Sequence, residues 1–385
     1  MNNHRRVLLS VAGTTPQIIT ETVYALVRRK YPFIPDEIRV ITTKQGQLAL
    51  NKGLFEEGHF ARLVEALGLP AGSIEFSPAH IDVVLGPDEQ PLHDLISAED
   101  HTAAADQIIR TVAKLAADDT TAIHASLAGG RKTMGFYLGK AMSLFGRPAD
   151  RLSHVLVNEP FEETPGFYFP PLEPVDLPLR RGGTANTANA RISLAEIPFL
   201  HLGRSLHANV LRAINVDDFS FSDAVLWAQR ATEQPTVVVN IETRSVWLGE
   251  EKSVELQLSP LHKAFYVWML WRRANEQTVF NITGTDWSPL YDLQLKMGMT
   301  DGLDVNALDG DLKKGNFDNW NHKINAALKQ AMGPFAGPLY GLSPRKKGTA
   351  GTQALKTPPR SGDYLLAGLH PEDIHFVPPT LGDDQ

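Results

Sequence analysis

The stretch Ala125-Ser126-Leu127-Ala128-Gly129-Gly130-Arg131-Lys132-Thr133-Met134 decides the fold, because in it a strand runs through two glycines into a helix. Residues 120–124 predict the strand, and apolar residues at helical spacing from Met134 to Phe145 predict the helix. Glycines let the backbone approach a bound group, and a helix N-terminus offers free N–H donors and partial positive charge. This turn between strand and helix is therefore suited to bind an anion such as a phosphate. A plain turn with two solvated cations is the alternative.

The composition is that of an ordinary globular protein. Of its 385 residues 43% are hydrophobic and 21% charged, enough for two or three domains with a sizeable core. Neither a long apolar run nor a cleavage-type site follows His4-Arg5-Arg6, so we expect no membrane span, no signal peptide and a cytoplasmic location. The absence of cysteine excludes disulfides and thiolate chemistry. A net charge of −7 does not suggest a protein coated in nucleic acid, although local basic patches can occur.

A second strand-to-helix turn of the same kind lies near the N-terminus. The apolar run from Arg6 to Ala12 is typical of a buried parallel strand that ends at Gly13. In Thr14-Thr15-Pro16-Gln17 a hydroxyl residue precedes a proline, the pattern of a helix N-cap and first helical position. The two threonine hydroxyls and the local N–H groups can receive a phosphate oxygen.

Further strands alternate with helices along the first part of the chain. Strands are expected over 37–43, within 74–84 and over 122–127 and 154–157, and helices over 47–67 and 98–116. This alternation predicts an α/β fold, a Rossmann-like parallel sheet wrapped by helices on both faces. Such sheets bind ligands at the carboxyl ends of their strands, so both glycine-bearing turns are expected at one edge.

Prolines and glycines break the chain between residues 158 and 190. We therefore predict a ligand-binding domain over 1–160, a linker over 161–190 and a C-terminal domain over 191–385. An edge strand over 166–169 is the alternative for part of the linker.

The C-terminal part predicts an α+β domain. A helix over 220–232, a hairpin over 236–248 and a helix after Ser259-Pro260 precede a polar-faced helix over 317–332. A strand, the basic segment 343–360 and a second strand follow, which is the plan of a winged helix. Candidate DNA contacts are Asn321, Lys323, Arg345, Lys346 and Lys347. A protein-binding or dimerisation domain with a solvated loop is the alternative.

Four segments together resemble a known group: Gly13 to Gln17, Thr42 to Gly46, His124 to Met134, and Arg151 to Val157. They look like the CARF domain (CRISPR-associated Rossmann fold) of the ring nucleases that accompany type III CRISPR systems, over about residues 5 to 160. The resemblance implies a homodimer that binds cyclic oligoadenylates, second messengers made on viral infection, at its interface. It also implies cleavage of the ring, here cyclic tetra-adenylate, to end the response.

Carried over to this chain, the resemblance places the catalytic roles on Thr15 and Lys132. Ligand contacts are expected at Gly13, Thr14, Gln17, Thr43, Gln45, Gly129, Gly130, Arg131 and Thr133. Relatives often carry serine at the first position, so the extra methyl group of Thr15 leaves open whether the ring is cut or only sensed. The ring brings its own nucleophile, a ribose 2′-OH, so cleavage needs positioning and charge stabilisation but no metal or other cofactor.

Other readings of the sequence stay open or are disfavoured. The same protein can be a sensor that holds the ring uncut and regulates transcription through DNA. His370-Pro371-Glu372 reads as a solvated loop rather than a zinc site, and His124 as a packed strand residue. After residue 190 the Arg-x4-6-His spacing of a HEPN ribonuclease is missing. The lack of Gly-x-Gly-x-x-Gly and Gly-Lys-Ser/Thr disfavours a metabolic nucleotide enzyme.

Overall fold

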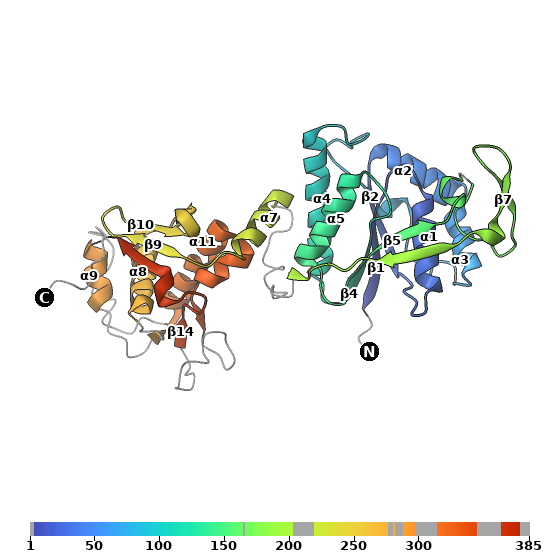
Figure 1. Ribbon diagram of the computed structural model, residues 1–385. Helices are drawn as coiled ribbons and strands as arrows, with labels where there is room; N and C mark the ends of the chain where they lie inside the picture. Colours follow the sequence, from blue (N-terminus) through green and yellow to red (C-terminus); the bar gives the residue numbers. More distant parts are fainter. Residues whose placement is uncertain are drawn as a thin grey trace. The chain divides into compact units, whose positions relative to one another are not determined.

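The computed structural model describes residues 4–164, 166–202, 219–275, 280–281, 288–296, 314–344 and 363–377. The chain forms two compact units, Met1–Ala224 and Val225–Gln385, each with its own sheets and core (Figure 1). Within the described residues, no helix combines the length and the apolar character needed to cross a membrane.

A six-stranded sheet forms the centre of the first unit, in the order β3-β2-β1-β4-β5-β8. Its strands are β1 (Arg5–Val11), β2 (Glu37–Thr42), β3 (Ile81–Val83), β4 (Thr121–Ser126), β5 (Arg151–Val157) and β8 (Ile192–Glu196). All neighbours are parallel except β8, which runs antiparallel to β5. The chain builds outward from β1 to β3 and then returns to the other side of β1, so the order reverses between β1 and β4. That reversal is where a parallel sheet opens a ligand crevice.

Helices cover both faces of this sheet, which confirms the predicted α/β class. They are α1 (Gln17–Arg28), α2 (Lys44–Leu50), α3 (His59–Ala66), α4 (Ala98–Ala116) and α5 (Lys132–Phe145). Figure 1 shows α4 and α5 together on one face and α1 with α3 on the other. Because both faces are covered, residues 7–11 of β1 are buried without alternation.

A buried ion pair joins the starts of β4 and β5. The Asp150 carboxylate is fully buried and accepts hydrogen bonds from the Ile123 amide at 2.8 Å and the Arg147 amide at 2.7 Å. The Arg147 guanidinium donates to that carboxylate and to three backbone carbonyls, among them Thr121 at 2.6 Å. The pair therefore satisfies backbone groups at the end of α4, in the loop that follows it and at the start of β4.

Replacing Asp150 with alanine is expected to lower the free energy of unfolding by about 3–5 kcal/mol, because it leaves the Arg147 charge without its buried partner. Urea unfolding of the purified protein measures this. Glu196→Ala is the control, since the Arg29–Glu196 pair is solvent-accessible and its loss is expected to cost less than about 1 kcal/mol. Equal stability losses in the two variants would contradict the assignment.

The stretch expected to be a linker belongs to the first unit. Residues 161–190 include a short hairpin, β6 (Asp176–Pro178) and β7 (Thr184–Asn186), but no strand at 166–169. Phe161, Phe167 and Tyr168 are buried, and the Thr20 hydroxyl donates to the Tyr168 carbonyl at 2.8 Å. The two units divide at Ala224 and Val225 instead, because β8, expected to open the second domain, joins the first sheet.

The second unit contains two small sheets. One has the order β11-β10-β9-β15 and the other β12-β14-β13. The strands are β9 (Val237–Asn240), β10 (Ser245–Leu248), β11 (Val254–Glu255), β12 (Phe280–Asn281), β13 (Ser343–Pro344), β14 (Asp363–Leu365) and β15 (Ile374–Val377). The helices are α7 (Phe221–Arg230), which spans the division, α8 (Pro260–Ala274), α9 (Ser288–Lys296) and α11 (Lys314–Tyr340), which kinks at Gly333.

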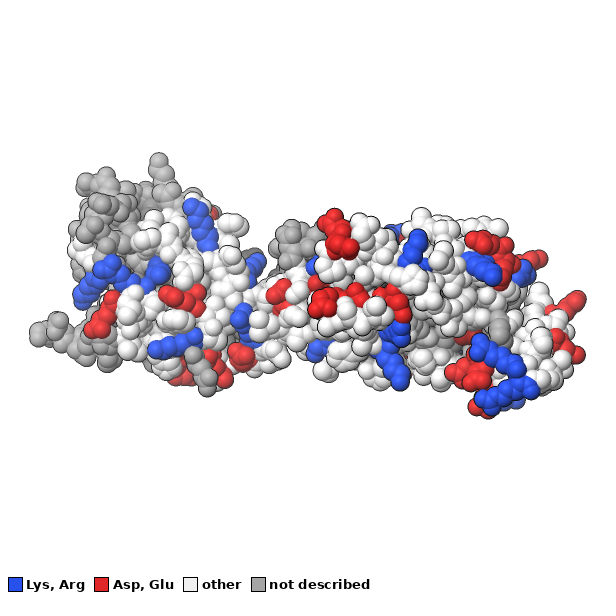
Figure 2. Space-filling view, turned by 90° about the horizontal axis from the view of Figure 1, so that it is seen from above, with Lys and Arg blue, Asp and Glu red and all other residues white. Residues whose placement is uncertain are grey.

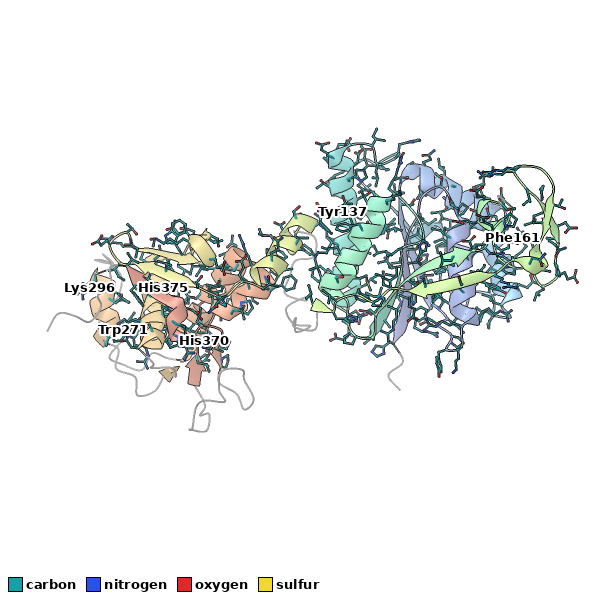
Figure 3. All side chains as sticks on the ribbon, in the orientation of Figure 1. Tyr137, Phe161, Trp271, Lys296, His370 and His375 are labelled. Carbon is teal, nitrogen blue, oxygen red and sulfur yellow. The ribbon has the colours of Figure 1, made fainter. Side chains whose placement is uncertain are left out.

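Aromatic and aliphatic side chains from α8 and α11 form the core of the second unit. Phe265 and Trp268 of α8 are buried, and Phe265 packs edge-on against Phe317 of α11. In the segment from His370 to His375, the side chains of His370, Glu372 and His375 are exposed as expected, but the backbone is not a loop. It forms a short 3-10 helix and then enters β15, which pairs in parallel with β9 (Figure 3).

Candidate functional site

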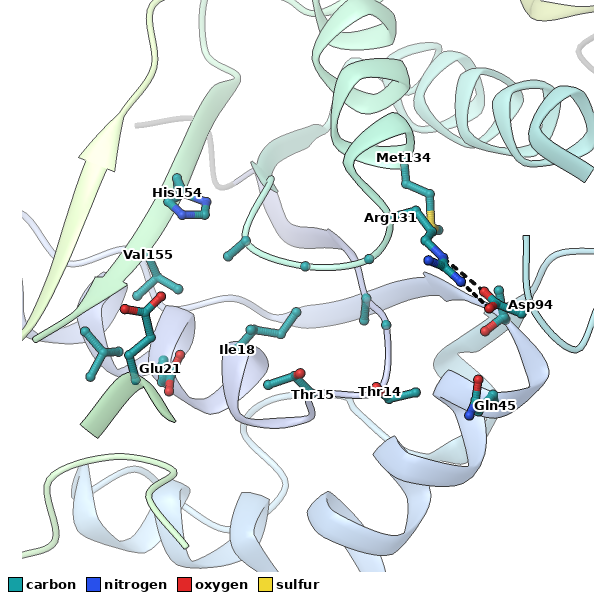
Figure 4. Close-up of a pocket in the computed structure, with 18 residues that line it drawn as sticks. Thr14, Thr15, Ile18, Glu21, Gln45, Asp94, Arg131, Met134, His154 and Val155 are labelled. Carbon is teal, nitrogen blue, oxygen red and sulfur yellow. Dashed lines mark hydrogen bonds and ion pairs between the residues drawn. The ribbon is translucent and has the colours of Figure 1, made fainter. Parts of the chain in front are cut away.

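A cavity of about 590 Å³ opens at the carboxyl ends of the strands of the first sheet (Figure 4). The residues after β1 and β4 form its centre, and residues of α1, α2 and β5 complete the wall. The lining residues are Ala12, Gly13, Thr14, Thr15, Ile18, Glu21, Thr43, Gln45, Asp94, Ala128, Gly129, Gly130, Arg131, Met134, His154, Val155, Val157 and Glu162. The strand order therefore brings both glycine-bearing turns to one cavity.

The two turns approach each other backbone to backbone. A Cβ atom on Gly13 would stand 3.5 Å from the Cα of Gly130, and one on Gly129 would stand 2.9 Å from the Val11 carbonyl oxygen. Gly130 has a φ of +74°, in the left-handed region where residues with a side chain are strained. Glycine is thus needed at position 129 for close packing and at position 130 for the turn itself, and it leaves the backbone open toward the cavity.

Two threonine hydroxyls lie in the middle of the cavity wall. Thr14 and Thr15 are exposed to solvent, and no hydrogen bond from either hydroxyl is present among the described residues. The expected capping role of Thr15 is not observed, because α1 begins at Gln17 with Pro16 as its N-cap and without a side-chain cap. Thr43 is different: its hydroxyl accepts from the Gly46 amide at 3.3 Å and caps α2.

The cation in the cavity is already partnered. Arg131 Nε donates to Asp94 Oδ1 at 3.2 Å, and a second guanidinium nitrogen contacts the other carboxylate oxygen. This hydrogen bond holds the pKa of Asp94 below its usual range. An anionic ligand that binds Arg131 must therefore compete with Asp94 or bind beside it.

Three residues expected at the site are not part of the cavity wall. Lys132 is exposed at the first position of α5, and Gln17 occupies the first position of α1. Thr133 Oγ1 lies 3.0 Å from His101 Nδ1. The roles proposed for these three residues stay predictions.

His124 is a packed strand residue, as predicted. It is fully buried, its Nε2 lies 2.7 Å from Ser153 Oγ, and its ring packs against Phe33. Burial lowers the pKa of His124 to about 3, so the ring is neutral at physiological pH.

The sequence reading missed four polar residues of the cavity wall: Glu21, Asp94, His154 and Glu162. Burial, together with the nearby Glu162 carboxylate, raises the pKa of Glu21 to about 7. The spacing of Glu21 three residues after Ile18 places both on one face of α1 and is a signal that was available. No local sequence pattern identifies Asp94 or Glu162 as site residues, because both are distant in sequence from the two turns.

Charges on the first unit are mixed rather than concentrated. On the face seen in Figure 2, Lys and Arg side chains alternate with Asp and Glu side chains. The cavity itself has one arginine and three carboxyl groups in its wall. Any attraction for an anion there comes from local donors, not from a broad positive field.

The candidate DNA contacts of the second unit are only partly described. Asn321 and Lys323 lie on α11, where Asn321 Oδ1 accepts from Asn325 Nδ2 at 3.1 Å and Lys323 is exposed. Arg345, Lys346 and Lys347 lie outside the described residues.

Comparison with known proteins finds a family and structural likenesses. The family model of CRISPR-associated protein NE0113 (Cas_NE0113) matches residues 15–233. No curated protein matches. Among solved structures, Can2 from Sulfobacillus thermosulfidooxidans in complex with cyclic tetra-adenylate is similar at 11% identity and a TM-score of 0.22, covering 84% of this chain and 67% of Can2. A likeness this weak says nothing about a shared ligand.

Proposed function

The chain belongs to the CRISPR-associated protein NE0113 family, and we propose that it binds a cyclic oligoadenylate, with cyclic tetra-adenylate the favoured ring, in the cavity between its two turns. The convergence of the turns after β1 and β4 on one cavity carries this proposal. Backbone N–H groups at the start of α5 and the hydroxyls of Thr14 and Thr15 are donors suited to phosphate oxygens.

We also propose that the site is shared by two copies of the chain. A cavity of about 590 Å³ is in the range that holds one small molecule, whereas the ring has four nucleotides. A two-fold symmetric ring matches a two-fold homodimer, in which each copy binds one half of the ring. Arg131 and Lys132 then come from both copies and offset the phosphate charge.

The proposed reaction is a transesterification within the ring. A ribose 2′-oxygen forms a bond to the adjacent phosphorus, the bond from phosphorus to the 5′-oxygen breaks, and the proton of the 2′-OH passes to the leaving 5′-oxygen. The products are a 2′,3′-cyclic phosphate and a 5′-hydroxyl. Thr15 orients the 2′-OH or a phosphate oxygen, and Lys132 stabilises the charge that develops on the phosphoryl group.

Incubation of the purified protein with cyclic tetra-adenylate and a chelator tests the proposal. The first product has the same mass as the ring, so chromatographic retention must identify it, while a second cut gives dimers of half the mass. Binding followed by a retention shift supports ring cleavage. Binding with intact ring after long incubation at excess protein leaves a sensor that does not cut, and no binding contradicts the proposed function.

DNA binding by the second unit is a second candidate function, and the topology of one sheet favours it. The order β12-β14-β13 places β12, the strand after α8, next to β14, and both strands that flank residues 345–362 are in the same sheet. A winged helix has this arrangement, with a helix corresponding to α11 in the major groove. The protein then acts as a ring-gated regulator.

Neutralising Arg345, Lys346 and Lys347 together is expected to weaken DNA binding and to reduce its dependence on salt by about one unit of log–log slope per lost phosphate contact. Gel shifts with and without cyclic tetra-adenylate across a salt series measure both quantities. Arg180→Ala combined with Arg181→Ala, in the first unit, is the control for charge alone. The absence of any shift by the unaltered protein at low salt eliminates this second function.

A further inference from the structure

Glu21 is a largely buried residue whose carboxyl group faces the cavity without a partner. The residue is 8% exposed, and it lines the cavity. Among the described residues, no hydrogen bond or ion pair to its carboxyl group is present. The carboxyl group is open to the cavity although most of the residue is buried, so it is free to bind a ligand that enters there.

Apolar side chains and a second carboxyl group, that of Glu162, line this end of the cavity. Ile18, Val155 and Val157 line it beside Glu21, and Figure 4 shows Glu21 and Val155 on the side away from Arg131 and Asp94. A phosphate is poorly suited to a pocket with apolar walls and two carboxyl groups, whereas a flat base with a polar edge is well suited to it. The cavity therefore has a phosphate end near the turns and a base end at Glu21.

We propose that Glu21 reads the base of one adenylate, with its protonated carboxyl group donating to adenine N1 and accepting from the N6 amino group. This inference rests on the proposed function. Asparagine and glutamine pair with adenine through one donor and one acceptor, and a protonated carboxyl group offers the same pattern. Guanine and hypoxanthine carry a hydrogen on N1, which an ionised carboxylate accepts without taking up a proton, so only the adenine contact requires the protonated group.

The surroundings of Glu21 favour its neutral form. Burial and the Glu162 carboxylate raise the pKa of Glu21 to about 7, and the phosphates of a bound ring act in the same direction. His154 of β5 also lines the cavity, while Glu196 of β8 is paired with Arg29 at 2.6 Å. The titratable side chains of α3, which also packs on α1, line a second cavity: His59, Arg62 and Glu65.

Above pH 7, proton uptake therefore accompanies ring binding. Below pH 7 the carboxyl group is already protonated and the affinity is expected to be constant. Above pH 7 the affinity is expected to fall about tenfold per pH unit, because each bound ring must protonate Glu21.

Isothermal titration with cyclic tetra-adenylate between pH 5.5 and 8.5 tests the inference (the pH range is about 1.5 units either side of the expected midpoint). Glu21→Gln keeps the donor and acceptor and is expected to bind the ring with the pH dependence removed. Glu21→Ala is expected to bind about tenfold or more weakly below pH 7. Glu163→Gln makes the same substitution next to Glu162 but outside the cavity wall, so it is the control and should behave like the unaltered protein.

Cyclic tetra-inosinate separates base reading from ring binding. It lacks the N6 amino group and carries a hydrogen on N1 that the ionised carboxylate can accept, so its affinity is expected to fall less above pH 7 than that of the adenylate ring. If the adenylate ring binds but neither pH nor Glu21→Ala alters its affinity, the inference is wrong and the proposed function stands. If no ring binds at any pH, both are wrong. Thermal melting of each variant confirms that it is folded.

Discussion

Lys132→Ala is expected to slow ring cleavage by about 100- to 1,000-fold, the usual effect of removing one donor that stabilises developing charge. Lys132 begins α5 directly after Arg131, and it is exposed, so its ammonium group is available to a ring that lies across the helix N-terminus. Because the charge on the phosphoryl group grows in the transition state, the loss should appear in kcat more than in ring affinity. Single-turnover cleavage assays, with affinity measured separately, resolve the two.

The control for Lys132→Ala is Lys140→Ala, which removes the same charge from the same helix away from the cavity wall. It is expected to cleave the ring like the unaltered protein. Arg131→Ala complements these two variants. Arg131 lines the cavity, where it pairs with Asp94, and the loss of its positive charge should weaken ring binding. Normal cleavage by Lys132→Ala would remove Lys132 from the mechanism and leave phosphate stabilisation to Arg131 and the helix N–H groups.

Gly129→Ala is expected to lower ring affinity about 10- to 100-fold, since overpacking a tight site costs about 1–3 kcal/mol. A Cβ atom at this position would stand 2.1 Å from Ile18 Cδ1 and 2.9 Å from the Val11 carbonyl oxygen. The turn must then move away from β1, which changes the wall that both turns form. Equilibrium binding of cyclic tetra-adenylate measures the loss.

Gly135→Ala makes the same substitution one turn into α5, where a Cβ atom meets only the Leu127 carbonyl oxygen at 3.9 Å. This variant should bind the ring normally and gain about 0.5–1 kcal/mol of stability, the usual advantage of alanine over glycine in a helix. Unchanged ring affinity in Gly129→Ala would mean that the turn after β4 does not shape the binding site.

The first sheet and the centre of the cavity could be predicted from sequence because their signals are local. An apolar run, a glycine and a helix start follow one another within a few residues at both Gly13 and Gly129. Parallel strands place their carboxyl ends at one edge, so two such turns are brought together once the α/β class is known. Eight of the predicted site residues line the cavity: Gly13, Thr14, Thr15, Thr43, Gln45, Gly129, Gly130 and Arg131.

The parts that could not be predicted depend on contacts distant in sequence. Asp94 accepts a hydrogen bond from Arg131, which is 37 residues away in the sequence. Glu162 lies in a proline-rich segment whose sequence predicts a linker. β8 joins the sheet as an antiparallel edge, a pairing that no local pattern of residues 192–196 specifies. Glu21 was missed because a single carboxylate in an amphipathic helix usually faces solvent.

Hydrogen–deuterium exchange of the unaltered protein, with and without saturating cyclic tetra-adenylate, tests the central claim most directly. The amides of the two turns, residues 13–17 and 129–133, are expected to exchange more slowly when the ring is bound, together with residues 43–46 before and within α2. Linear tetra-adenylate at the same concentration should protect them less. Protection elsewhere with these turns unchanged, or no protection at all, would contradict the assignment of this cavity as the ring-binding site.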